Sequence, residues 1–386
     1  MKHSTDRFLT THVGSMIRPQ KIQDFNAAIA AGQPIDQEDY QATLRSEVAN
    51  VVRKQAECGI DVPSDGEFGK PSWLHILGRL TGFEMRDVER PRVGFRGWDA
   101  ERRFKDFYDA SPLGGRGAIR QAVCVGPISY TDAGRAQLTR DVANFKAALQ
   151  NVQVEEAFLP VVAPCSISVN YRNEYYKTDE EFLFAVAEAM HEEYKTITDA
   201  GLIVQADDAI LANLHDPVVD SGLDYRSWVD MNLRALNHGL RGIPEDMVRY
   251  HLCWGSWPGP HTTDVPLAEI VDLILRISCQ ASSIEAANPR HEWEWVVWQE
   301  TKLPDGKILL PGVVSHAISH VEHPELIAQR IRRFADLVGP ENVIASTDCG
   351  FAQGGAIARQ EQEIVWAKLE SLAEGARIAS RARAKA

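Results

Sequence analysis

The feature that most constrains the fold of this chain is a repeated alternation of short apolar runs with longer helical stretches. Each run has the length of a strand and ends in polar residues, and a helical pattern follows before the next run. Strands that alternate with helices predict a parallel sheet, and eight repeats predict a (β/α)₈ barrel, the TIM-barrel form of the α/β class. The eight runs span residues 11–15, 60–67, 156–164, 201–208, 248–254, 280–288, 308–315 and 342–350.

Signals for helix starts and ends fill the gaps between these runs. Thr178 with Glu181 three residues later forms a capping box, and Gly201 suits the end of the same helix. A second helix is predicted from Asp264 to about Arg276, with Pro266 in its first turn.

One segment interrupts the alternation and defines the domain organisation. Residues from about 85 to 130 are rich in Arg, Gly and charge, and the apolar run at 121–129 is typical of an added hairpin. We expect this inserted hairpin and loop region to cover one mouth of the barrel. The 386 residues are enough for one large domain, so we expect a single TIM-barrel domain over 1–375 and a flexible tail over 376–386.

Composition narrows the class of protein. Hydrophobic residues make up 44% and charged residues 25%, as in a globular domain, and the net charge of −13 argues against a nucleic-acid partner. The chain has no apolar run of about 18 residues and no apolar signal-peptide core at its start, so we expect no membrane span. Six sparse, irregularly spaced cysteines favour a reducing cytoplasmic location with free thiols.

Chemically active side chains stand at the ends of the predicted strands. In a barrel these carboxyl ends share one mouth, where active sites are built, so residues far apart in sequence are expected to meet there. The strand-end residues are Ser15, Asp65, Glu67, Asp207, Asp208, His251, Cys253, Glu285, His316, Asp348 and Cys349.

His251 and Cys253 suggest a metal site because they alternate by two along a predicted strand and so face the same side. Alone, such a pair is more often a buried cysteine beside a hydrogen-bonded histidine. Zinc favours tetrahedral sites of Cys sulfur, His nitrogen and carboxylate oxygen. Glu285 and Cys349, at two further strand ends, complete a candidate set of four ligands. Cys58, Cys124, Cys165 and Cys279 lack such company and are interpreted as small buried side chains.

Several longer motifs occur in order along nearly the whole chain. They are TTHVGSMIRP, SDGEFGK, HLC, SSIEAANPRHEWEW, PGVVSHAISHVEHPELIAQRI and STDCGF. Together they resemble the catalytic domain of cobalamin-independent methionine synthase. Full-length synthases carry a second, N-terminal barrel for which this chain is too short. It therefore looks like the single-barrel branch, which also includes the epoxyalkane:coenzyme M transferases.

The resemblance implies roles for individual residues. It implies that Zn²⁺ is the cofactor and that its ligands are His251, Cys253, Glu285 and Cys349. It also implies that an amino-acid thiol is held by Ser15, Glu67 and Asp207, for which simple solvation of strand ends is the alternative. Arg18 and Lys70, just past two strand ends, are candidates for binding the acid group of a substrate.

Two positions depart from the family pattern. Asn170 stands where the synthases carry a tryptophan that stacks on folate, which puts folate use in question. Ala317 stands at the register of the catalytic histidine, with His316 and His320 nearby. Since histidine titrates near neutrality, either one is a candidate proton donor to the leaving atom.

The resemblance implies a zinc-dependent thiol alkyltransferase in which a homocysteine-type thiolate attacks a methyl or other alkyl donor. The thiolate is the nucleophile, and a bound zinc ion removes the thiol proton. The partners are then a small-molecule thiol and an alkyl donor, without nucleic acid or membrane, and a homo-oligomer is compatible with the sequence. The alternatives are epoxide ring opening by a thiol such as coenzyme M, and a non-catalytic zinc-stabilised barrel. Two Cys ligands argue against a metal hydrolase.

Overall fold

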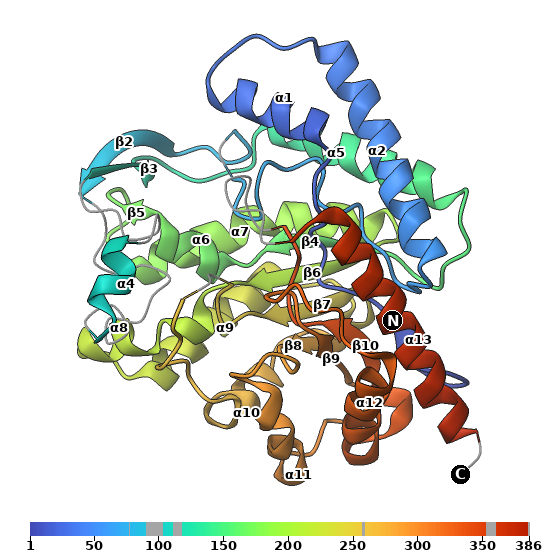
Figure 1. Cartoon of the computed structure of the whole chain (residues 1–386). Helices are drawn as coiled ribbons and strands as arrows, with labels where there is room; N and C mark the ends of the chain where they lie inside the picture. Colours follow the sequence, from blue (N-terminus) through green and yellow to red (C-terminus); the bar gives the residue numbers. More distant parts are fainter. Residues whose placement is uncertain (77, 90–102, 111–117, 257–258, 353–359, 385–386) are drawn as a thin grey trace.

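The centre of the molecule is a curled sheet of seven parallel strands in the order β1-β10-β9-β8-β7-β6-β4 (Figure 1). The computed structural model describes residues 1–76, 78–89, 103–110, 118–256, 259–352 and 360–384. The seven parallel strands confirm the predicted α/β class with a parallel sheet. The strands are β1 Leu9–Thr10, β4 Phe158–Val162, β6 Ile203–Asp208, β7 Val248–Leu252, β8 Ala281–Ile284, β9 Ile308–Val314 and β10 Ile344–Thr347.

Six of the eight predicted runs contain one of these strands, from β4 to β10. Every residue of β4, β6, β7, β8, β9 and β10 is buried, as expected for a sheet that is covered on both faces. The run at 11–15 was placed slightly late, because β1 covers Leu9–Thr10 and ends just before it.

The run at 60–67 forms no named strand. Val62 makes an isolated parallel bridge with Thr11, and its N–H donates to Thr10 O at 3.0 Å. On the other side, Phe158 N–H of β4 donates to Pro63 O at 3.1 Å. Residues 61–63 thus hydrogen-bond to both edge strands of the sheet. Pro63 has no N–H to extend this pairing, which explains why the segment is so short.

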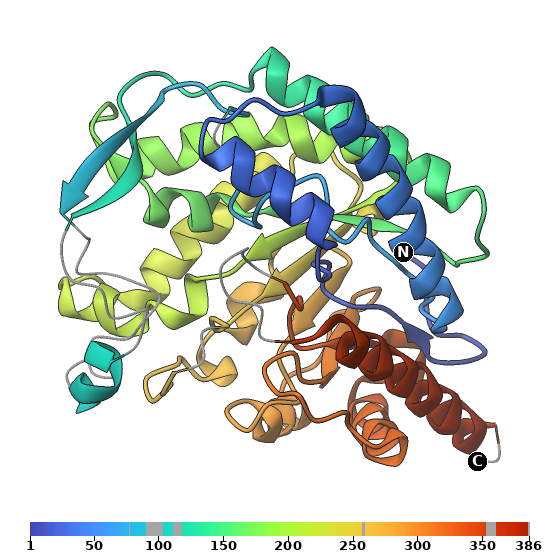
Figure 2. The same cartoon turned by 45° about the horizontal axis from the view of Figure 1, so that its top comes forward.

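Helices cover the outer face of the curled sheet (Figures 1 and 2). Thr178 caps α7 by accepting from Glu181 N–H at 3.1 Å, and Gly201 after the helix has φ 81°, so both predicted ends are confirmed. The helix predicted from Asp264 to about Arg276 is shorter, because a 3₁₀ turn over Leu267–Glu269 is followed by α10 over Val271–Ile274. The helices of the layer are α1 Gln20–Ala30, α2 Gln37–Glu57, α5 Asp132–Leu149, α6 Pro164–Asn170, α7 Asp179–Asp199, α8 His215–Asp220, α9 Tyr225–Gly239, α10 Val271–Ile274, α11 Val297–Glu300, α12 Pro324–Val338 and α13 Gln362–Arg383.

No helix among the residues that the structure describes has both the length and the apolarity needed to cross a membrane.

A small added sheet takes two of its three strands, β2 (Phe83–Glu89) and β3 (Ala118–Cys124), largely from the segment predicted to be inserted. β2 pairs antiparallel with β3, and the short β5 (Arg172–Asn173) joins β3 in parallel. The short helix α4 (Lys105–Ala110) lies between β2 and β3 in sequence. The remainder of the predicted loop region, residues 90–102 and 111–117, lies outside the described residues.

The expectation of a flexible tail is wrong for residues 376–383. They form the last turns of α13, in which Ala376 and Ala379 are buried. Arg383 Nη1 donates to Ser4 O at 2.7 Å, and Phe8 N–H donates to Ser380 Oγ at 2.9 Å. The many basic residues of this segment led to the prediction of a flexible tail. The alanines on the other face of the helix are small enough for it to pack closely against the start of the chain.

Candidate active site

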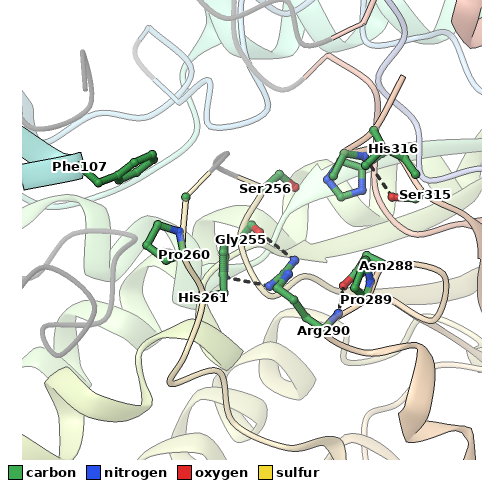
Figure 3. Close-up of a pocket in the computed structure, with 13 residues that line it drawn as sticks. Phe107, Gly255, Ser256, Pro260, His261, Asn288, Pro289, Arg290, Ser315 and His316 are labelled. Carbon is green, nitrogen blue, oxygen red and sulfur yellow. Dashed lines mark hydrogen bonds between the residues drawn. The ribbon is translucent and has the colours of Figure 1, made fainter. Parts of the chain in front are cut away.

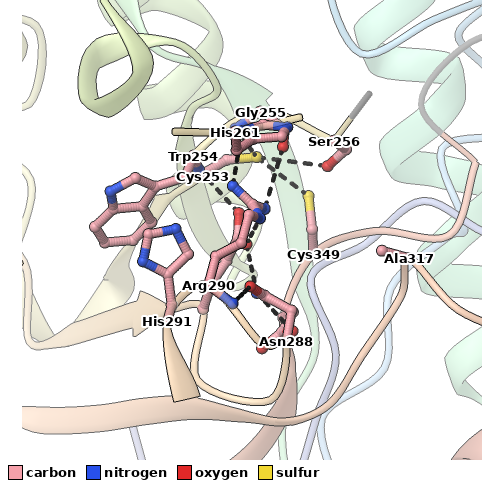
Figure 4. Close-up of polar contacts among 12 residues, drawn as sticks. Cys253, Trp254, Gly255, Ser256, His261, Asn288, Arg290, His291, Ala317 and Cys349 are labelled. Atoms are coloured by element: carbon pink, nitrogen blue, oxygen red, sulfur yellow. Dashed lines mark hydrogen bonds and ion pairs between the residues drawn. The ribbon is translucent and has the colours of Figure 1, made fainter. Parts of the chain in front are cut away.

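Three of the four predicted metal ligands converge at the carboxyl ends of β7 and β10. His251 lies on β7, Cys253 follows that strand, and Cys349 follows β10. Their ligand atoms all lie within 4.8 Å of one another, and all three residues are buried. The two Sγ atoms are 3.6 Å apart, although 96 positions separate the residues in sequence (Figure 4).

The chemistry of this cluster fits a soft divalent cation. Nδ1 of His251 pairs with Ser283 Oγ on β8 at 3.1 Å, while its buried Nε2 makes no hydrogen bond with any described residue. A partner on one ring nitrogen that leaves the other for the metal is typical of ligating histidines. The adjacent Cys349 thiol and burial hold the pKa of Cys253 well above its ordinary value, and a cation at this point would oppose both effects.

Glu285, the fourth predicted ligand, stands beside the cluster without joining it. Its Oε1 accepts from Trp254 N–H at 2.8 Å, and its Oε2 accepts from Asn288 Nδ2 at 2.7 Å and from Arg290 Nη2 at 3.0 Å. Burial, together with the neighbouring Cys253, raises the pKa of this carboxyl. The structure therefore shows Glu285 held by protein donors on both oxygens.

A pocket of about 310 Å³ opens next to the cluster (Figure 3). Ser256 connects the two, because it lines the pocket and its Oγ lies 3.6 Å from Cys253 Sγ. His316 is buried and lines the pocket, whereas His320 is exposed and is not among the lining residues. Of the two candidate proton donors, His316 alone faces this space.

Glu67 and Asp207 are both buried at the strand ends. Burial, with Glu67 as the next cause, raises the pKa of Asp207 well above its ordinary value. The pKa of Glu67 is also raised by burial, and its buried Oε2 makes no hydrogen bond with the described residues. Glu67 is moreover the only non-glycine residue described with a positive φ, at 60°. A backbone strained in this way commonly marks a functional position.

Ser15 packs against the turn that carries Cys349. Its Oγ accepts from Ala352 N–H at 3.2 Å, and Phe351 N–H donates to Ser15 O at 2.9 Å. A Cβ on Gly350 would lie 2.1 Å from Ser15 Oγ, so glycine is required for this close approach.

Arg18 and Lys70 are used within the protein. Arg18 donates to Lys70 O at 2.9 Å, to Glu67 O at 3.0 Å and to Ala352 O at 3.1 Å. Lys70 Nζ donates to Pro160 O. Both side chains therefore stabilise the loops around Glu67. Their contacts give no support to the prediction that they bind the acid group of a substrate.

Two further charged residues belong to the site and were not predicted from the sequence: Arg290, which contacts Glu285, and Asp264, which contacts Arg290. Arg290 Nη1 lies 2.5 Å from Asp264 Oδ2, and Asp264 in turn pairs with His291 Nε2 at 3.2 Å. The available signal was the dense polar run NPRHEWE directly after the strand end at Glu285.

The fold and the site define a class: parallel α/β proteins with a His/Cys/Cys group that could hold a metal at the carboxyl ends of the strands. Within that class the chain belongs to the family of the cobalamin-independent synthase catalytic domain. The model of this family matches residues 8–86 and 121–376. The interval between the two matched parts includes the last three residues of β2, all of α4 and the first three residues of β3.

Relatives with similar sequences cover most of the chain. A methionine synthase of Sulfolobus acidocaldarius is 25% identical over 348 residues, which are 88% of this chain and 85% of that protein. A methionine synthase of Thermococcus kodakarensis is 23% identical over 376 residues, 96% of this chain and 93% of the relative.

Solved structures share the fold. A B12-independent methionine synthase from Shewanella sp. W3-18-1, in complex with selenomethionine, superposes with a TM-score of 0.71 at 17% identity. The match covers 98% of this chain and 100% of that one. A putative vitamin-B12-independent methionine synthase from Listeria monocytogenes gives a TM-score of 0.66 at 21% identity and covers 97% and 98%. At these identities the likeness concerns the fold.

Proposed function

We propose that this protein is a zinc-dependent S-methyltransferase of the methionine-synthase type. It transfers a methyl or related alkyl group to a homocysteine-type thiol. The observation that carries the proposal is the buried cluster of His251, Cys253 and Cys349 beside a pocket, in a chain whose relatives are methionine synthases. Small molecules are thus the partners, a thiol and an alkyl donor.

We further propose that the sheet closes into the eight-stranded barrel expected from the sequence. Residues 61–63 hydrogen-bond to both β1 and β4, the two edge strands. In that arrangement they are the eighth, shortened strand, and the ends of β1, β6, β7, β8 and β10 face one mouth.

The cluster would hold the metal through one imidazole nitrogen and two sulfurs, with Glu285 as the adjacent fourth donor. The chemistry that zinc supplies when bound is loss of the proton from a substrate thiol at neutral pH. Burial of the surrounding residues excludes water, which preserves the nucleophile for the alkyl donor.

The acidic side of the site favours an amine-bearing thiol. Glu67 and Asp207 would bind the ammonium group, since two buried carboxyls with raised pKa values gain most from a cationic partner. The same pair disfavours a sulfonate thiol such as coenzyme M. His316, on the pocket wall, would hold the proton that the leaving atom takes up.

The first test of the proposal measures bound zinc and homocysteine methylation together. We expect the wild-type protein to bind about one zinc ion, and Cys253→Ser or Cys349→Ser to lose both the metal and the activity. Cys279→Ser is the matched control, since Cys279 is also buried but lies outside the cluster. Full activity in metal-free protein would contradict the proposed function.

A screen of substrates identifies the two partners. Homocysteine, coenzyme M and glutathione are each paired with methylfolate, methylcobalamin and an epoxide in the presence of zinc. We expect turnover with homocysteine. Turnover with coenzyme M and an epoxide alone would favour ring opening in place of methyl transfer.

A further inference from the structure

Arg290 connects the candidate metal centre with the pocket. Its Nη2 donates to Glu285 Oε2 at 3.0 Å, and its side chain also lines the pocket (Figures 3 and 4). Among the described lining residues Arg290 is the only lysine or arginine. One guanidinium therefore touches both the fourth predicted ligand and the space in which the alkyl donor would bind.

The guanidinium is fixed from behind. Nη1 lies 2.5 Å from Asp264 Oδ2 and 2.8 Å from His261 Nδ1. Asp264 is itself held by His291, which pairs with the buried Glu294 at 2.8 Å. Only 23% of the Arg290 side chain is exposed. These contacts fix the position of its guanidinium group, so that the positive charge lies next to the Glu285 carboxylate.

Glu285 has its hydrogen-bonding capacity largely filled by this arrangement. Trp254 N–H occupies Oε1, and Asn288 and Arg290 occupy Oε2. A carboxylate that already neutralises a cation attracts a second cation less strongly, because the positive charge of the first opposes the second. The cluster of His251, Cys253 and Cys349 has formed without Glu285.

We propose that Arg290 is a positioning residue that competes with the metal for Glu285 and so keeps this fourth ligand exchangeable. This inference rests on the proposed function. A weakly held carboxylate leaves the coordination position that a substrate thiol must take. The family match includes Arg290 but assigns it no role.

The sign of a change in zinc affinity tests the proposal. We expect Arg290→Gln to bind zinc about tenfold more tightly than the wild type, measured by competition with a chromophoric chelator, a change opposite in sign to the loss that usually follows removal of a partner of a metal ligand. Arg290→Lys keeps the positive charge and is expected to stay close to the wild type. In Arg290→Gln, X-ray absorption should show an oxygen ligand that persists when homocysteine is added.

If Arg290 only supports the structure of the site, its replacement should weaken zinc binding instead of tightening it. Arg330 is the matched control, because it is a buried arginine that donates to Ala287 O at 3.3 Å, in the segment after Glu285, and does not contact Glu285. Arg330→Gln is expected to lower the unfolding temperature without tightening zinc binding. Folded Arg290→Gln with unchanged or weaker zinc affinity overturns the inference. If the wild type itself binds no zinc, the proposed function fails, and this inference fails with it.

Discussion

His316 and His320 lie four positions apart and differ in one respect that matters for catalysis. His316 is buried on the pocket wall, and His320 is exposed on the loop beyond it. A proton donor has to reach the reacting atom directly or through one water molecule. The positions of the two side chains therefore favour His316 as the proton donor, for which the sequence offered both histidines.

Replacing the two histidines separately tests this assignment. We expect His316→Asn to lower kcat roughly 10²–10⁴-fold, the usual contribution of a general acid, with little change in zinc content. His320→Asn serves as the control and should stay within about twofold of the wild type. Equal losses in both variants would show that the proton comes from elsewhere.

Asp208 makes the stability of the protein depend on pH. Burial raises its pKa to about 6, while Ser166 and the N–H of Leu211 remain as hydrogen-bond partners. In the unfolded chain it ionises near pH 4, so between about pH 4 and pH 6 the folded state binds more protons. The contribution of this group to the free energy of unfolding then falls by roughly 3 kcal/mol as pH rises through this window.

Asp208→Asn isolates that contribution, because asparagine cannot ionise but still accepts hydrogen bonds. We expect urea denaturation to show a smaller loss of stability between pH 4 and pH 6 in the variant than in the wild type. Parallel pH profiles of the two proteins would mean that Asp208 ionises normally in the folded state.

At the scale of elements, β7 shows how a local pattern builds a site. Arg249, His251 and Cys253 alternate along the strand and its end, so they face the same side of the sheet. The parallel register places His251 opposite Ser283 on β8, which supplies its hydrogen-bond partner. The spacing of His251 and Cys253 was enough to predict that they face the same side, and Ser283 on the neighbouring strand orients the His251 ring.

The short helix α4 extends the pocket from the added segment. Phe107 of α4 is 45% exposed and lies on the pocket wall, on the side of Pro260 (Figure 3). An exposed aromatic side chain on a pocket wall offers contact area to a bound molecule. We therefore expect α4 to contribute to binding of the proposed alkyl donor.

The variant Phe107→Ala measures how much this side chain contributes to binding of the alkyl donor. We expect KM for the alkyl donor to rise about 2- to 10-fold, the equivalent of roughly 0.5–1.5 kcal/mol, while kcat and the KM for the thiol stay near the wild type. Tyr175→Ala is a suitable control, since Tyr175 is 50% exposed and does not line the pocket. A change in zinc content instead would place the role of Phe107 at the metal centre.

At the scale of the whole molecule, a buried arginine ties opposite parts of the sheet together. Arg249 of β7 donates to Thr11 Oγ1 at 2.9 Å and to His12 O at 2.6 Å, both just after β1. Its guanidinium also lies 3.8 Å from the ring centroid of Phe158 on β4. These contacts connect β7 with β4 and with the residues just after β1, so they reach both edges of the sheet.

Replacing Arg249 should lower the stability of the whole fold. We expect Arg249→Met to lower the free energy of unfolding by roughly 3 kcal/mol, because two charge-assisted hydrogen bonds are lost in the interior. Arg53→Met provides the comparison, since Arg53 forms an exposed pair with Glu57 that contributes at most about 0.5 kcal/mol. Equal urea midpoints for the two variants would refute the cross-sheet role.

The sequence by itself determined the alternation of strands and helices and the residues at the strand ends. Both follow from local periodicity, since side-chain direction repeats every two residues in a strand and burial on both faces makes strands apolar. On this basis the strands from β4 to β10 and the meeting of His251, Cys253 and Cys349 were predicted.

Only the tertiary structure decided which partner each polar side chain takes. Glu285 is at the predicted place, yet Arg290 and Asn288 hold its carboxylate beside the thiols. The run at 60–67 became a single bridge, and the basic tail became part of a packed helix. In each case the outcome depends on competition between contacts from distant parts of the chain, and no local pattern records which of them is stronger.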